Sequence, residues 1–174
     1  LVPLLSWYEP AFDAEPDIVD DWNPPANKAM TDFYKCRWPA GLAATDASLA
    51  EHFDSLNAAE AEGGGHEAVI SFSHFLPRPE LLPEKRFLFF PNLSKAVGSR
   101  ALGRRVARLR PHRHVFGHSH YGWDAEVDGV RYLQAALAYP KERETRGFSL
   151  RLGDEGPVDA DAQGGVVSPV LVYD

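Results

Sequence analysis

The sequence predicts an α/β fold whose sheet becomes antiparallel toward its C-terminal part. Two observations lead to this prediction. Short apolar runs alternate with amphipathic helical segments, in the order strand, helix, strand, helix, strand. A hairpin pattern follows at 123–137, and apolar runs at 147–152 and 166–174 indicate later strands.

The composition narrows the range of possible functions. The 174 residues correspond to about one domain. The net charge is −7, so we expect no nucleic-acid partner. The single cysteine, Cys36, excludes an internal disulfide and a thiolate zinc site. No apolar run approaches the roughly 18 residues of a membrane span, so we expect no membrane partner.

The N-terminal stretch predicts one strand followed by a long loop. Residues 2–8 form a short apolar run that is typical of a buried strand. Residues 9–25 are acidic and rich in proline, and loops of this length are often functional. We expect one or two helical turns within 27–39.

Two helices then flank the next strand. The first is expected to begin at Thr45 or Asp46, which are good N-cap residues, and to end at the glycines of 63–65. The strand follows at 67–73. The second helix is predicted over 94–109, where apolar residues recur with helical spacing. Arginines crowd this helix, and we interpret them as a solvated face rather than a nucleic-acid patch.

Three histidines stand where predicted strands end. His118 and His120 follow the strand of 113–117, and a spacing of two lets both side chains project to one side. His74 ends the preceding strand. Parallel strands joined by a crossover helix would bring these two ends side by side. Neutral imidazoles bind Zn²⁺, Mn²⁺ or Fe, so we predict a metal site from His74, His118 and His120.

The simpler interpretation is that each histidine is an ordinary hydrogen-bonded residue. For His74 taken alone, this is the more common situation. His112 and His114 lie at the entrance of the 113–117 strand, and we interpret them as solvated or structural. The metal prediction therefore rests on the combination of all three strand-end histidines.

The stretch "SFSHFLP" followed by "HVFGHSH" resembles the C-terminal half of a calcineurin-like metallophosphoesterase, over about residues 67–140. The resemblance implies a partial four-layer α-β-β-α sandwich with two metal ions at strand ends. It also implies that His74 and His118 hold the second metal and His120 the first. The implied ions are Mn, Fe or Zn, and the implied substrate is a phosphoester.

Three motif blocks of that family are absent: Asp-x-His, Gly-Asp-x-x-Asp and Gly-Asn-His. In the family these blocks supply carboxylate and asparagine ligands and a histidine that protonates the leaving group. The chain also begins at Leu1, and its one methionine is Met30. We therefore expect residues 1–174 to be the C-terminal portion of a single domain whose N-terminal half is missing.

The resemblance implies metal-dependent phosphoester hydrolysis by the parent protein. Two ions about 4 Å apart need bridging carboxylates, which three neutral histidines cannot replace. We therefore expect the chain alone to be poorly active. The alternative is a non-catalytic relic or binding module that keeps only part of the metal site.

Two other metallohydrolase classes also use His-x-His. The metallo-β-lactamase pattern continues with Asp and His, but Gly122 and Trp123 stand at those positions here. Amidohydrolase barrels carry the motif near their beginning, and too few residues follow His120 to complete a barrel.

Overall fold

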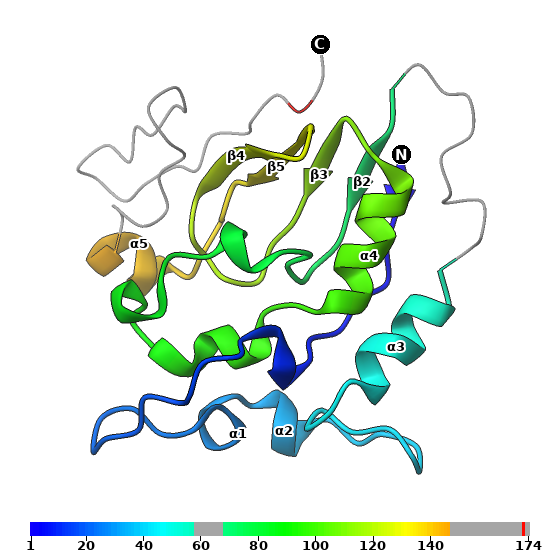
Figure 1. Ribbon diagram of the computed structural model, residues 1–174. Coiled ribbons are helices and arrows are strands. Elements are labelled where there is room, and N and C mark those ends of the chain that lie inside the picture. The colour runs from blue at the N-terminus through cyan, green and yellow to red at the C-terminus, as the bar shows by residue number, and fades with distance from the viewer. Residues whose placement is uncertain (58–67, 147–171, 173–174) are drawn as a thin grey trace.

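The computed structural model describes residues 1–57, 68–146 and 172, and they form one five-stranded sheet with helices around it (Figure 1). The strand order is β1-β2-β3-β5-β4. The strands are β1 (Val2–Pro3), β2 (Ile70–Phe72), β3 (Arg113–Val115), β4 (Trp123–Val127) and β5 (Val130–Gln134). All neighbours pair in parallel except β4 and β5, which are antiparallel. The predicted α/β class with a mixed sheet is therefore confirmed.

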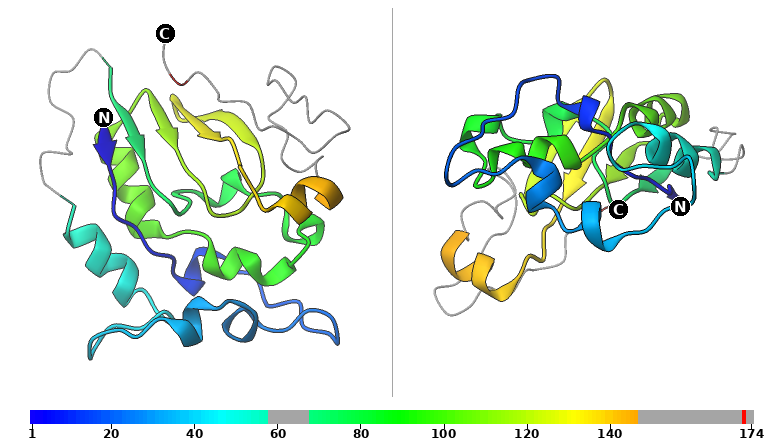
Figure 2. Two further views of the ribbon diagram at one scale, coloured as in Figure 1. Left: turned by 180° about the vertical axis from the view of Figure 1, so that it is seen from behind. Right: turned by 90° about the horizontal axis from the view of Figure 1, so that it is seen from below.

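Helices surround the carboxyl ends and one face of the sheet. They are α1 (Ala26–Ala29), α2 (Asp32–Lys35), α3 (Ser48–Ser55), α4 (Arg100–Leu109) and α5 (Pro140–Arg146). Short 3₁₀ helices are η1 (Pro10–Phe12), η3 (Pro79–Leu81), η4 (Lys85–Phe87) and η5 (Pro91–Ala96). Seen from the front and from behind, α4 lies over one face of the sheet (Figures 1 and 2), and α3 packs against α4. No helix in the described ranges is long and apolar enough to cross a membrane.

The core lies between the sheet and α4. Ser71, His114 and Tyr132 are register partners on three neighbouring strands, and all are buried. The apolar core joins Tyr132 to Leu102 and Val106 of α4. The apolar face that helical spacing predicts for this segment is thus the face that packs on the sheet.

The helix predicted over 94–109 begins later than expected. Residues 91–96 form η5 instead, and α4 starts after Ser99, whose hydroxyl accepts a hydrogen bond from Leu102 N at 3.2 Å. Between them, Gly98 forms a β-bridge with Leu76. A side chain at Gly98 would collide with the Leu76 carbonyl. Because the backbone around Gly98 pairs with Leu76, it is not available for helical hydrogen bonds, and the helix begins only after Ser99.

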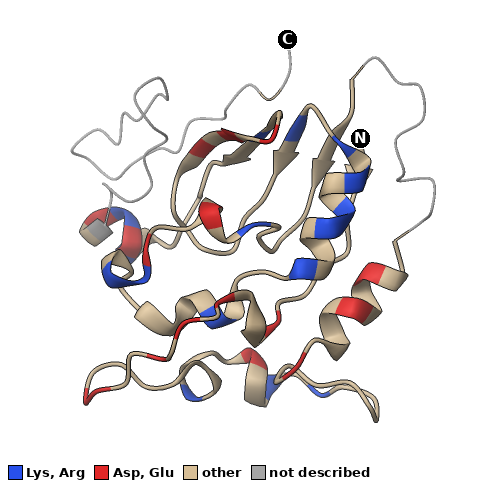
Figure 3. Cartoon of the chain, viewed as in Figure 1, with Lys and Arg blue, Asp and Glu red and all other residues tan. Residues whose placement is uncertain are grey.

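The prediction of a solvated arginine face is wrong for Arg105. Basic residues do follow one another along α4 (Figure 3). Arg104 is exposed, but Arg105 is buried and forms an ion pair with Asp54 of α3. The guanidinium also donates to the Asp54 carbonyl at 3.0 Å. Packing of α3 against α4, which periodicity in one helix cannot reveal, encloses this charge with its partner.

The other predicted elements have mixed outcomes. The hairpin is confirmed, with positive φ angles of 52° at Asp128 and 76° at Gly129. The 27–39 stretch contains α1 and α2 in part, as expected. The first predicted helix corresponds to α3, and the strand predicted over 2–8 is shorter than expected. The later apolar runs, 147–152 and 166–174, lie outside the described residues apart from residue 172.

Candidate metal site

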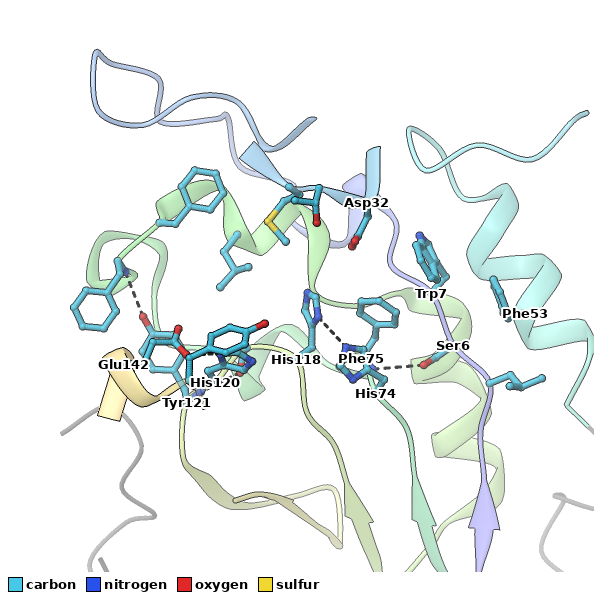
Figure 4. Close-up of a pocket in the computed structure, with 18 residues that line it drawn as sticks. Ser6, Trp7, Asp32, Phe53, His74, Phe75, His118, His120, Tyr121 and Glu142 are labelled. Carbon is cyan, nitrogen blue, oxygen red and sulfur yellow. Dashed lines mark hydrogen bonds and ion pairs between the residues drawn. The ribbon is translucent and has the colours of Figure 1, made fainter. Parts of the chain in front are cut away.

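The carboxyl ends of β1, β2 and β3 meet at one edge of the sheet. Leu5–Trp7 lie just past β1, His74 lies just past β2, and His118–Tyr121 lie just past β3. All three segments line a cavity of about 660 Å³ (Figure 4). The chain therefore gathers residues from three distant parts of the sequence because parallel strands end at the same edge.

The structure brings His74 and His118 into direct contact. His74 Nε2 lies 3.1 Å from His118 Nδ1, and the ring centroids are 5.0 Å apart. The contact follows from the parallel register of β2 and β3, which pairs Phe72 with Val115. Beyond the strands, Gly117 N donates to the His74 carbonyl at 3.1 Å and keeps the two segments together. The predicted adjacency of the two strand ends is confirmed.

A backbone carbonyl sets the protonation of the His118 ring. His118 Nε2 lies 2.9 Å from the carbonyl oxygen of Ala96. Because a carbonyl oxygen only accepts hydrogen bonds, Nε2 carries the proton. The lone pair is then on Nδ1, which faces His74. Such a carbonyl partner on the second ring nitrogen is typical of metal-binding histidines.

His120 has a comparable partner on a different ring nitrogen. Its Nδ1 lies 3.0 Å from Glu142 Oε2 of α5. A carboxylate partner places a proton on Nδ1 and leaves the Nε2 lone pair unused by this contact. His120 lines the same cavity as His74 and His118. The structure therefore places all three predicted site residues around one space, with His120 bonded separately from the other two.

The backbone of the His118–His120 turn is unusual. His118 has φ of 71° and His120 has φ of 59°, in the left-handed region that residues other than glycine rarely occupy. Buried Gln134 holds the turn: its amide donates to Ser119 Oγ at 2.8 Å and to the Tyr121 carbonyl. Backbone strain of this kind clusters at functional sites.

Burial keeps the paired imidazoles neutral near pH 7. It lowers the pKa of His118 to about 4. It also lowers the pKa of His74, and the nearby His120 acts in the same direction while Asp32 opposes it. Asp32 comes from α2 and lies across the cavity from the histidines (Figure 4). Neutral imidazoles are the form that binds metal ions.

The donor set suits one ion better than two. Two imidazole nitrogens bonded to one tetrahedral ion at about 2.0–2.1 Å lie about 3.4 Å apart. The 3.1 Å between His74 Nε2 and His118 Nδ1 is close to this separation. Within the described ranges, however, no group of three or more His, Cys, Asp or Glu side chains is placed to hold an ion. The ligand roles of His74, His118 and His120 remain a prediction.

Two acidic residues of the cavity were not predicted. Asp32 belongs to the four-residue helix α2, and Glu142 belongs to α5, beyond the hairpin. Neither stands in a motif or beside a histidine in the sequence. The sequence carries no signal for them because only the packing of short helices over the strand ends brings them to the cavity.

Comparisons with known proteins give a fold rather than a family. No family model matches the sequence, and no curated protein matches it. The structure is similar to the crystal structure of phosphopantetheinyl hydrolase (PptH) from Mycobacterium tuberculosis, with a TM-score of 0.60 and 21% identity. The match covers 85% of this chain and 53% of that chain, so this chain spans about half its length.

This likeness confirms the predicted fold class and corrects the predicted membership. The described residues have a mixed α/β fold with one five-stranded, mostly parallel sheet, similar to that of the phosphopantetheinyl hydrolase. The assignment to the C-terminal half of the calcineurin-like superfamily, carried by residues 67–140, is wrong as stated. No family model matches, and the structural likeness covers 85% of the chain. The motif residues lie only at strand ends within residues 67–140, so they say nothing about β1 and the helices before β2, which belong to the same fold. At 21% identity, the chain shares this fold with the phosphopantetheinyl hydrolase.

Proposed function

We propose that this chain carries a single divalent-metal site for phosphoester hydrolysis, with His74 and His118 as its first ligands. One observation carries the proposal: His118 Nδ1, with its proton displaced to the other ring nitrogen by Ala96, faces His74 Nε2 at 3.1 Å. Two facing imidazole nitrogens need either a proton or a cation between them. In the neutral pair that proton can only be the one that His74 carries on Nε2, and a divalent cation can take its place when the His74 proton moves to Nδ1.

The surrounding residues support a metal ion at this position. His120 offers its Nε2 to the same cavity, with Glu142 orienting the ring. Imidazole ligands of this kind accept Mn, Fe or Zn ions. A bound ion would act as a Lewis acid on a phosphoryl oxygen and lower the pKa of a bound water. The phosphoester substrate is proposed from the likeness to the phosphopantetheinyl hydrolase fold.

The same arrangement predicts weak activity for the chain by itself. Among the described residues, no third His, Cys, Asp or Glu side chain, His120 included, is placed with His74 and His118 in a group that could hold an ion. This observation also supports a second candidate function, a non-catalytic binding module that keeps a partial metal site. Metal uptake without turnover would favour that second function.

Metal titration of the chain tests the proposal. We expect at most one Mn²⁺ per chain by calorimetry, with slow hydrolysis of 4-nitrophenyl phosphate. Replacing His118 by Ala should weaken Mn²⁺ binding by about tenfold or more, and His74→Ala should act similarly. His52→Ala, at an exposed position on α3, is the matched control and should leave binding unchanged. Unchanged binding in H118A, or two tightly bound ions with ordinary turnover, would contradict the proposed site.

A further inference from the structure

We infer that the cavity selects phosphodiesters with an apolar group on each side of the phosphorus over phosphomonoesters. The inference rests on the proposed function and names its substrate class. Two independent features of the cavity lead to it. The first is an apolar surface on both sides of the histidine pair, and the second is the sign of the charges around it.

One apolar surface comes from the chain after β1 and from α3. Trp7 and Phe53 stack with ring centroids 5.7 Å apart and an interplanar angle of 17°. Leu5 lines the cavity beside them, although half of its surface is exposed. The Asn57 side chain accepts from Leu5 N at 2.7 Å and donates to its carbonyl at 2.9 Å, which ties this strand end to the chain just after α3. These two hydrogen bonds to the Leu5 backbone therefore fix the position of the Leu5–Trp7 segment that forms this surface.

The other apolar surface comes from the segment before η5 and from the end of the His118–His120 turn. Phe89 and Tyr121 stack with centroids 6.3 Å apart and an interplanar angle of 17°. Tyr139 packs against His120 with centroids 5.3 Å apart. Phe89, Tyr121 and Tyr139 all line the cavity. Phe89 is 44% exposed, so its ring presents apolar area that a ligand can cover.

The histidine pair lies between these two surfaces. In Figure 4, Trp7 and Phe53 are on one side of His74 and His118, and Tyr121 is on the other. A phosphorus atom bound at the pair would have an aromatic surface in each direction. A monoester carries one organic group and covers one surface, whereas a diester carries two and covers both. Each additional apolar contact adds to affinity in proportion to the area removed from water.

The charges of the cavity favour the same substrate. Its charged side chains are the carboxylates of Asp32 and Glu142, and no Lys or Arg lines it among the residues that the structure describes. A phosphomonoester carries close to two negative charges at neutral pH, since its second pKa is about 6. A diester carries one, because its second oxygen is esterified. In the metal-free site, repulsion from the two carboxylates therefore weighs more heavily against the monoester.

Binding of three phosphates in the absence of metal, where no hydrolysis is expected, separates the two effects. We would titrate the metal-free chain by calorimetry with diphenyl, methyl phenyl and phenyl phosphate. Methyl phenyl phosphate has the charge of a diester but only one ring. We expect affinity to fall from diphenyl to methyl phenyl to phenyl phosphate, by about fivefold at each step. Phenyl phosphate binding as tightly as diphenyl phosphate would overturn the inference.

Substitutions at exposed cavity residues test each apolar surface. Phe89→Ala and Leu5→Ala should each remove most of the advantage of diphenyl over methyl phenyl phosphate. Phe87→Ala and Leu56→Ala are matched controls, because these residues are 64% and 54% exposed and line none of the described cavity. Asp32→Asn should strengthen phenyl phosphate binding most. An unchanged diphenyl advantage in both cavity variants would overturn the two-sided site.

Hydrolysis assays distinguish a failure of the proposed function from a failure of the diester preference. If the binding preference holds but bis(4-nitrophenyl) phosphate is not cleaved with Mn²⁺, the proposed hydrolase function fails and the diester preference stands. If 4-nitrophenyl phosphate is cleaved faster than the diester at equal concentration, the hydrolase function stands and the diester preference fails.

Discussion

Two histidines four residues apart in one segment, His114 and His118, have opposite surroundings. His114 lies within β3, in the buried interior of the sheet. His118 lies just beyond the strand, at the edge of the cavity. Burial lowers the pKa of both rings. The residue type and the direction of the pKa shift are therefore the same, although His114 is fully buried and His118 only partly. A second difference is what each ring nitrogen contacts.

His114 has a hydroxyl partner on each ring nitrogen. Its Nδ1 lies 2.8 Å from Ser71 Oγ, and its Nε2 lies 3.0 Å from Ser73 Oγ. Ser73 Oγ donates its single proton to the Phe75 carbonyl at 2.7 Å, so it accepts from His114 Nε2. Ser71 then donates to Nδ1. Both nitrogens are satisfied by the neighbouring strand, which is typical of a structural histidine.

His118 has the same proton position but a different partner for its lone pair. Its Nε2 donates to a carbonyl, as His114 Nε2 donates to a hydroxyl, and its Nδ1 faces a second imidazole rather than a hydroxyl. The His74 imidazole supplies a proton to this contact only in the tautomer that carries it on Nε2, and a cation can replace that proton when it moves to Nδ1. The comparison teaches that a candidate ligand is marked by a lone pair whose donor a metal ion can displace, rather than by burial alone.

The largest expected effect is on stability at His114. Replacing His114 by Ala leaves a cavity and takes the acceptor from the buried Ser71 hydroxyl, which should lower the free energy of unfolding by about 3 kcal/mol. His118→Ala should cost about 1 kcal/mol, because its side chain borders an existing cavity. Urea unfolding of both variants at pH 7.5 measures the difference. A cost at His118 equal to that at His114 would contradict the division into structural and site histidines.

The next effect is a pH dependence that belongs to His114. Burial lowers its pKa to about 3, below the value of about 6.5 for an unfolded histidine. The unfolded chain therefore binds more protons than the folded chain between these values. The stabilisation is present above about pH 6.5 and is lost as the pH falls toward 3, by up to about 1.4 kcal/mol per pH unit.

His114→Gln removes this titration and keeps an amide donor and acceptor. Between pH 7 and pH 5, the variant should lose about 2 kcal/mol less unfolding free energy than the parent chain. Urea midpoints at the two pH values give the comparison. Equal losses in the two proteins would show that His114 is not held neutral by the fold.

The smallest effect is a reversal between glycine and alanine. At position 118, where φ is 71°, Gly should be more stable than Ala by about 1 kcal/mol. At position 114, inside a strand, Ala should instead be more stable than Gly by about 0.5–1 kcal/mol. Thermal unfolding of the four single variants tests the sign at each position. The same sign at both positions would show that the His118 backbone is not strained.

The histidine trio and its strands could be predicted from the sequence for a definable reason. Apolar runs mark strands locally, and a helix between two strands makes their parallel pairing the expected connection. His74 and His118 therefore had to stand at neighbouring strand ends. The Asp128–Gly129 turn was predictable in the same way, because positive φ values at both central residues favour these residue types.

The chain order of strands and helices by itself determined the α/β class, the parallel pair β2–β3 and the meeting of His74 with His118. Only the tertiary structure decided that Asp32, Glu142 and the two aromatic surfaces border that pair. It also decided that Arg105 is buried and that α4 starts at Arg100. The physical reason is range: strands follow from local periodicity and connectivity, whereas these features depend on contacts between segments far apart in the chain, which leave no pattern in either segment.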